Sequence, residues 1–261
     1  MKLRGLIIIA VLFIAACAGP PKRPPDVYSE ITARDASRLV EILKAKNAAV
    51  SPCKGIGQIG IYGSKGSREV RAAWIATPDG RLRVEALGLT GQPFAKMICS
   101  HSRCYFLFRG DDNCLRMEST GDTSLELLVG IELEAGDVAL LLAGGVPIKS
   151  HDSVAAYETA SGEKLLVLKR RFSGTVQTVR FSADRERVRE MTVFGWAGEL
   201  YRAEIIGYMN VQGRDIPSEL RISDFGENRM RVSAKRCRTG IKPPEGVFTP
   251  NLPEEARCDN R

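Results

Sequence analysis

The feature that most constrains the fold is an alternation of apolar and polar residues with a period of two. Apolar side chains occupy every second position from Val70 to Ala76, and again from Leu82 to Ala86. The turn Thr77-Pro78-Asp79-Gly80 separates the two runs. Successive side chains of a strand point to opposite faces, so each run predicts a strand with one buried face. Two such strands joined by a short Pro/Gly turn form an antiparallel pair.

The same pattern recurs along most of the chain. Further strands are predicted at Ile59 and Ile61 and over residues 94–99, 104–108, 114–118, 164–169, 175–182, 188–194, 200–208, 216–223 and 229–235. Short strands separated by turn signals are typical of antiparallel sheets. We therefore expect a mainly β (α+β) protein of roughly eleven strands in one strongly curved antiparallel sheet.

A helix is predicted before the first strand. Ala36, Leu39, Val40 and Leu43 follow the i, i+3, i+4, i+7 spacing of one helix face, with Asp35 as the expected N-cap.

Two further short helices are predicted within residues 123–143. Thr123-Ser124-Leu125-Glu126 fits a capping box, and a second apolar stretch, 138–142, is stopped by Gly144-Gly145. These helices should cover the sheet.

The first residues are typical of a secretory signal peptide. Lys2 and Arg4 precede an apolar stretch, Leu6–Phe13, and then Ile14-Ala15-Ala16-Cys17. The ending on cysteine resembles the lipobox of bacterial lipoproteins. That resemblance implies removal of residues 1–16, a diacylglycerol on Cys17 and a further acyl chain, such as palmitate, on its amine. Two acyl chains anchor a protein stably to a membrane. The alternative is a secreted protein with a cysteine at the cleavage site by chance.

Residues 17–27 form the expected lipidated cysteine and proline-rich tether, and residues 28–261 one folded domain. Ala18–Pro25 contains four prolines, a composition that keeps a tether extended. No later apolar stretch approaches the roughly 20 residues needed to cross a bilayer.

Once Cys17 is assigned to the lipid anchor, six cysteines remain. An even number in an exported protein suggests disulfides. Cys99 and Cys104 flank Ser100–Arg103 between two predicted strands, so they could pair across a hairpin. His101 within this Cys-x4-Cys spacing also suggests a metal site, but the other cysteines are scattered, and His151 is the one other histidine. We expect disulfides and no metal.

The charge pattern leaves two interpretations open. The chain has 38 Lys and Arg against 31 Asp and Glu, and Lys169–Arg171 begins a basic cluster that continues to Arg189. This cluster could contact anionic lipid headgroups, or it could be a solvated strand edge. Nucleic acid is not an expected partner of an exported lipoprotein.

The sequence does not favour an enzyme. It contains no phosphate-binding loop, nucleophile elbow or HExxH motif. Ser150-His151-Asp152 is better explained as a surface turn, because members of a catalytic triad are rarely adjacent in sequence. We expect a monomer without a cofactor.

Three stretches resemble the LolA/LolB superfamily, the lipoprotein carrier and receptor of diderm envelopes. Trp74–Gly88 is similar to the family's early hairpin, Leu127–Leu133 with Leu140–Pro147 to its helical pair, and Tyr208–Ile222 to its late hairpin. The resemblance covers most of the chain after about residue 35, as pattern rather than identity. It implies an incomplete β-barrel closed by a few short helices. The additional cysteines indicate a divergent LolB-like branch.

The resemblance also implies a function. Family members hold an acyl chain or a hydrophobic partner between the concave sheet and the helical lid. Residues expected to line such a cavity, or else to fill a core, are Trp74, Leu82, Val84, Phe106, Phe108, Leu141, Phe194 and Tyr208. Leu87 and Leu89 occupy the loop that LolB-like proteins direct at the membrane; here they either do so or tuck under the sheet.

The expected protein is therefore a lipid-anchored binding protein on the periplasmic face of the outer membrane. Ala18 resembles the signal for that location. Its cargo would be a lipoprotein or a similar lipidic molecule, received from a periplasmic carrier and inserted in the outer membrane. The alternative is a platform of an envelope assembly that binds a protein partner in the same concave face.

Overall fold

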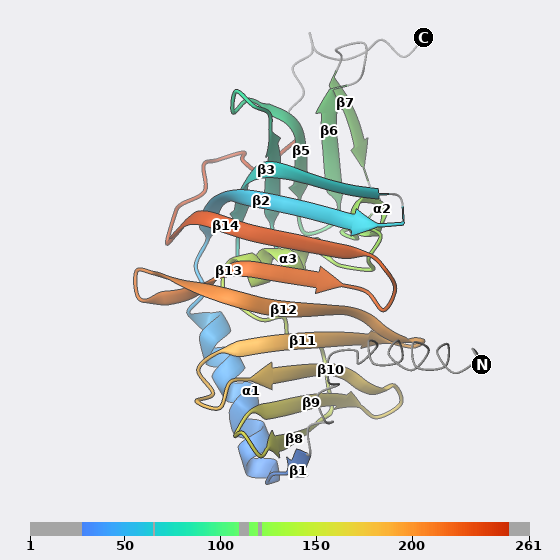
Figure 1. Ribbon diagram of the computed structural model, residues 1–261, viewed down its shortest axis with the longest axis vertical. Coiled ribbons are helices and arrows are strands. Elements are labelled where there is room, and N and C mark those ends of the chain that lie inside the picture. The colour runs from blue at the N-terminus through green and yellow to red at the C-terminus, as the bar shows by residue number, and fades with distance from the viewer. Residues whose placement is uncertain (1–27, 65, 110–114, 120–121, 251–261) are drawn as a thin grey trace, which may run out of the picture.

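The computed structural model describes residues 28–64, 66–109, 115–119 and 122–250, and it contains one large sheet. All fourteen strands in these residues pair antiparallel, in the order β1-β8-β9-β10-β11-β12-β13-β14-β2-β3-β4-β5-β6-β7 (Figure 1). The terminal strands of this order, β1 and β7, do not pair with each other, so the sheet stays open. The predicted curved, incomplete barrel is confirmed.

The strands vary widely in length. Their bounds are β1 Tyr28–Glu30, β2 Cys53–Gly63, β3 Gly66–Ala76, β4 Leu82–Leu87, β5 Pro93–Cys99, β6 Cys104–Arg109, β7 Leu115–Ser119, β8 Ser153–Thr159, β9 Lys164–Arg170, β10 Gly174–Phe181, β11 Val188–Gly195, β12 Gly198–Val211, β13 Arg214–Ser223 and β14 Arg229–Thr239.

Two strands were not predicted from the sequence. β8 reads Ser-Val-Ala-Ala-Tyr-Glu-Thr, which does not alternate cleanly, and the three-residue β1 is extended because it pairs with β8. These are tertiary effects, since edge pairing rather than local pattern decides them.

The first helix, α1 (Ala33–Ala48), buries the predicted stripe of Ala36, Leu39, Val40 and Leu43. Its N-cap is Thr32 and not Asp35. The Thr32 hydroxyl oxygen accepts a hydrogen bond from the backbone N–H of Asp35 at 3.2 Å. Asp35 therefore lies in the first turn, where a carboxylate favours the positive end of the helix dipole.

The other two helices in the described residues are short: α2 (Glu126–Val129) and α3 (Ala135–Leu142). The predicted capping box does not form, because Leu125 is the residue before α2 and it provides no capping side chain. None of the helices in the described ranges has the length and apolar composition to span a bilayer.

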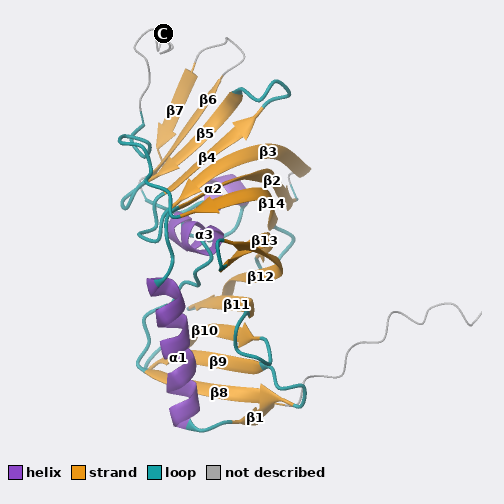
Figure 2. Ribbon diagram, turned by 90° about the vertical axis from the view of Figure 1, so that its left-hand side faces the viewer, coloured by secondary structure: helices purple, strands orange, loops and turns teal. Residues whose placement is uncertain are grey.

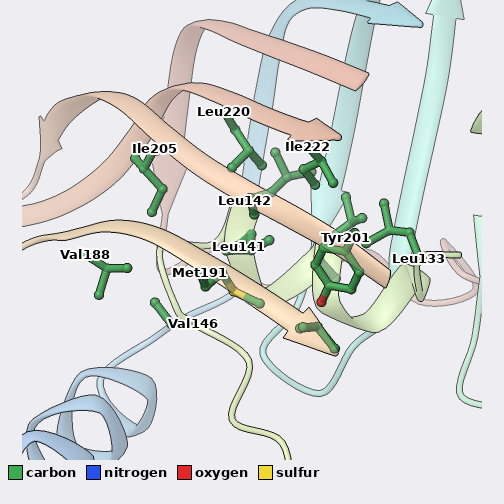
Figure 3. Close-up of a cluster of buried hydrophobic side chains, with 14 of the residues drawn as sticks. Leu133, Leu141, Leu142, Val146, Val188, Met191, Tyr201, Ile205, Leu220 and Ile222 are labelled. Carbon is green, nitrogen blue, oxygen red and sulfur yellow. The ribbon is translucent and has the colours of Figure 1, made fainter. Parts of the chain in front are cut away.

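The helices lie against one face of the sheet (Figure 2). α1 contacts β8 and β9, whereas α3 contacts β3, β4 and β13. Leu141 and Leu142 of α3 pack with Met191, Tyr201 and other buried side chains of β11 to β13 (Figure 3). α1 thus covers the concave face over β8 and β9, α3 covers it from β11 to β13 and also reaches β3 and β4, and α2 lies beside the remaining apolar region over β14 and β2 to β6.

Candidate functional site: an apolar cavity in the concave face

The inner side of β2 to β6 is apolar because strand register aligns the apolar positions. Ile59 pairs with Val70, and Val84 pairs with Met97, which in turn pairs with Phe106. Directly paired residues point to the same face. The period of two therefore aligns the apolar side chains of neighbouring strands on this one face.

This face encloses a cavity of about 590 Å³. That volume lies within the roughly 300–1,000 Å³ typical of pockets for small ligands. Its walls come from β14, β2 to β6, α2 and α3. The lining residues are Ile59, Ile61, Arg68, Val70, Ala72, Leu82, Val84, Ala86, Phe94, Ala95, Lys96, Met97, Phe106, Leu107, Phe108, Leu125, Leu127, Leu128, Val129, Val138, Leu142, Met230 and Val232.

Exposed apolar side chains mark the mouth of the cavity. Leu127 is 90% exposed, Phe94 50% and Leu128 45%, although all three line the cavity. Leu82 and Ala72, by contrast, are completely buried at its inner end. The cavity therefore has an apolar floor and an apolar opening beside α2.

The helix α2 is held beside the opening by few polar contacts. Gly130 ends it in the left-handed region at φ 73°, and the side-chain amide of Asn228 donates to the Gly130 carbonyl oxygen at 3.0 Å. Val129 is the buried residue within this single turn, and the buried Leu125 before it and Ile131 after it fix its two ends.

Four residues predicted to line a cavity lie along this one. Leu82, Val84, Phe106 and Phe108 come from β4 and β6 and belong to its wall. The cavity residues not predicted include Ile59, Val70 and Met97 on neighbouring strands, and the period-two pattern of β2, β3 and β5 would have indicated them.

The other four predicted residues lie elsewhere. Trp74 is 2% exposed, with its ring over Gly55, where a Cβ would collide with it. Leu141 is a buried residue of α3, and Phe194 is half-buried on β11. Tyr208 donates a hydrogen bond from its hydroxyl to the Val188 carbonyl oxygen at 2.6 Å.

The predicted membrane-facing loop forms the β4–β5 turn. Leu89 is fully exposed at its tip, whereas Leu87 ends β4, is half-buried and pairs with Arg71 and Pro93. Only Leu89 is thus placed to contact an external surface.

A polar network fixes the start of α3. Asp137 is buried in the first turn and accepts hydrogen bonds from the Tyr201 hydroxyl at 2.5 Å and the Lys149 ammonium at 2.7 Å. Burial, followed by the nearby Asp137 carboxylate, raises the pKa of Tyr201 well above its ordinary value. The phenol therefore stays protonated and keeps donating to the helix.

The sulfur chemistry is structural in character. Cys99 and Cys104 face each other across the β5–β6 hairpin and form a disulfide. Cys53 and Cys237 are free thiols, and burial raises their pKa values to about 12 and about 11. Such thiols are protonated and unreactive at neutral pH.

The remaining sulfur and imidazole groups show no metal site in the described residues. Cys17, Cys114 and Cys258 lie outside those residues. His101 lies 3.9 Å from the Asp79 carboxylate, and His151 Nδ1 is 2.9 Å from the Lys149 carbonyl oxygen. Within the ranges described, no three His, Cys, Asp or Glu side chains group as metal ligands.

A second hollow, of about 500 Å³, lies on the opposite face of the sheet. Arg83 stands between the cavity residues Leu82 and Val84 and so points to this outer face. The walls of the hollow also carry Lys54, Arg236 and Arg238. Four basic side chains and Glu85, which forms an ion pair with Arg83, border this hollow, so it is less suited to an acyl chain than the cavity on the inner face.

No protein-family model matches the sequence, and no curated protein does. The fold, however, is similar to that of a LolA superfamily protein from Nitrosomonas europaea. The TM-score is 0.52 at 11% identity, covering 84% of this chain and 98% of the other. The chain has a LolA-like fold.

Two further solved structures give lower TM-scores. A putative outer membrane lipoprotein-sorting protein domain from Vibrio parahaemolyticus gives a TM-score of 0.46 at 8% identity, covering 84% of this chain and 97% of the other. A DUF1329 family protein from Desulfovibrio piger gives 0.46 at 8% identity, covering 83% and 96%.

Proposed function

We propose that this protein is a lipid-anchored carrier that holds the acyl chains of a lipoprotein, or of a similar lipidic cargo, and helps to insert them in the outer membrane. The observation that carries the proposal is the 590 Å³ apolar cavity with an apolar mouth. Each methylene transferred from water into such a cavity stabilises the complex by roughly 0.8 kcal/mol. Transfer then needs no covalent step and no cofactor, because the bilayer buries the same chains.

The lining has a cation placed to orient the cargo. Arg68 is an exposed residue of β3 that contributes to the cavity wall. A guanidinium at the edge of an apolar site favours an amphiphile whose anionic end stays in water. We therefore assign the acyl chain to the floor and the polar end to the side of Arg68.

The anchor and the location belong to the same proposal. Residues 1–16 would be removed, Cys17 would carry the lipid, residues 17–27 would form the tether, and residues 28–261 would act as one domain below the outer membrane. The signal-like pattern before Cys17 supports this arrangement. A periplasmic carrier would deliver the cargo, and Leu89 would contact the receiving bilayer.

The test is displacement of a fluorescent fatty acid from the purified chain, with an Ala86→Phe variant. Ala86 is a half-buried cavity residue, so the added ring should occupy the cavity and abolish probe binding without lowering the melting temperature. The matched control is Ala73→Phe, a half-buried residue on the outer face of the neighbouring strand, which should bind the probe normally.

Two results would contradict the proposal. One is a wild-type protein that binds no fatty acid and carries no lipid in native mass spectrometry. The other is equal probe binding by both phenylalanine variants, which would place the probe outside this cavity. A stoichiometric protein partner cross-linked to the concave face would instead support the platform alternative.

A further inference from the structure

The exposed apolar side chains of the described residues are concentrated on one edge of the sheet. Phe172, Trp196 and Phe225 are 94%, 100% and 88% exposed. They lie in the turns β9–β10, β11–β12 and β13–β14. In an antiparallel sheet every second turn falls on the same edge. The three turns that carry these rings therefore follow one another along one edge, on the right-hand side of Figure 1.

The opposite edge provides an internal comparison. Its turns β8–β9, β10–β11 and β12–β13 contain Glu163, Asp184, Arg185, Glu186 and Arg187. Of the large hydrophobic residues exposed in the described chain, none lies in these turns. The apolar edge is thus a specific feature of one side and not a general property of the turns.

This edge continues to the mouth of the cavity. Asn228 of the β13–β14 turn bonds to Gly130 at the end of α2, and α2 carries Leu127 and Leu128. The row therefore runs from Phe172 through the other two rings to the exposed leucines that line the opening. We name Phe172, Trp196, Phe225, Leu127 and Leu128 the aromatic edge.

The β4–β5 turn, which carries Leu89, faces a different direction from the three aromatic turns. β5 and β6 run nearly vertically in Figure 1, whereas β9 to β12 run nearly horizontally. Turns of the two groups therefore point in different directions. By strand order the β4–β5 turn with Leu89 falls on the same edge of the sheet as the aromatic turns, further along, where the sheet has changed direction.

We propose that the aromatic edge docks on an anionic lipid bilayer and brings α2, with the cavity mouth, to its surface. This inference rests on the proposed carrier function and adds the surface through which cargo would leave. Phenylalanine and tryptophan are suited to the membrane interface, and large exposed apolar patches mark interaction sites.

At the Phe172 turn, charge favours a bilayer over a protein groove as the occupant, whereas the Phe225 turn carries Asp224 and Glu227. Arg170 and Arg171 directly precede Phe172, and the Arg171 guanidinium lies 5.7 Å from the centre of that ring. Basic residues beside inserted aromatic rings attract anionic headgroups. The second turn, Gly195-Trp196-Ala197-Gly198, has no charged residue, so nothing there resists entry into the interface.

Trp196 itself reports the contact. The chain has two tryptophans, and the other, Trp74, is 2% exposed. The fluorescence emission of Trp74 is measured in a Trp196→Phe variant and subtracted. The full chain is examined with vesicles of phosphatidylcholine and phosphatidylglycerol, with and without brominated phosphatidylcholine in the bilayer and iodide in the water.

The expected result is a shift of Trp196 emission to shorter wavelength, loss of most of its intensity on brominated lipid, and protection from iodide. Quenching by lipid should weaken in an Arg170→Gln, Arg171→Gln variant and without phosphatidylglycerol. As a control, Ala183→Trp in the Trp196→Phe background places the reporter on the opposite edge, where brominated lipid should have no effect.

Trp196 that remains accessible to iodide and unaffected by brominated lipid would overturn the proposal. So would equal quenching at Ala183→Trp, or protection of Trp196 by a protein partner alone. Fatty-acid displacement measured on the same samples separates this failure from failure of the cavity, because Trp196 does not line the cavity.

Discussion

At the residue scale, one tyrosine illustrates how a polar group can be buried at little cost. Tyr201 is 2% exposed, yet its hydroxyl donates to Asp137, which also binds Lys149. A buried polar group is tolerated when it is hydrogen-bonded and is destabilising when it is not. The network sets the position of α3, and α3 forms part of the cavity wall.

Tyr201→Phe should lower the free energy of unfolding at neutral pH by about 1–2 kcal/mol. The pKa of this phenol is higher folded than its ordinary value of 10.0, so the unfolded chain ionises first and wild-type stability falls as pH rises above that value. The variant should lose less stability over the same range. Urea unfolding from pH 7 to 11 measures both effects, and identical pH profiles would contradict this assignment.

Residue patterns also explain which cavity positions were predictable. Val84 and Phe106 follow from strand alternation, because register places them on the inner face. Trp74 has the same alternation but lies where its ring covers Gly55 and fills the core. Alternation gives the face of a side chain; it does not tell whether a helix covers that part of the face.

At the element scale, the turns and caps were the least predictable parts. The apolar stripe of α1 was predicted correctly, but the hydroxyl of Thr32 rather than Asp35 caps it. The Thr123–Glu126 pattern matched a capping box, yet the bridge between Ser124 and Glu134 holds that segment in another conformation. The isolated bridge thus changes the cap, while the helix itself, α2, still forms.

The β4–β5 turn gives a prediction at this scale. Leu89→Glu should leave the melting temperature unchanged, because the side chain is fully exposed. It should retain fatty-acid binding and lose cargo transfer to liposomes, since a carboxylate is disfavoured in the apolar layer. Ala183→Glu on the opposite edge is the control, and normal transfer by Leu89→Glu would make this loop an ordinary turn.

At the scale of the whole molecule, the sequence was sufficient for the fold class but not for the cavity. The period of two, the three helical segments and the resemblance of three stretches led to an open, curved sheet with a LolA-like fold. The cavity depends on how far α1 and α3 extend across the concave face. That distance is set by long-range packing, such as Leu141 against Met191, for which no local pattern exists.

The central claim is that an acyl chain lies in the cavity over β2 to β6. It is tested most directly by methyl NMR of the protein with a fatty acid that carries a spin label near the end of its chain. We expect strong broadening for the methyl groups of Val70, Val84 and Ile59, and none for Leu166 and Leu168 under α1. Broadening confined to those two leucines, or none at all, would contradict the claim.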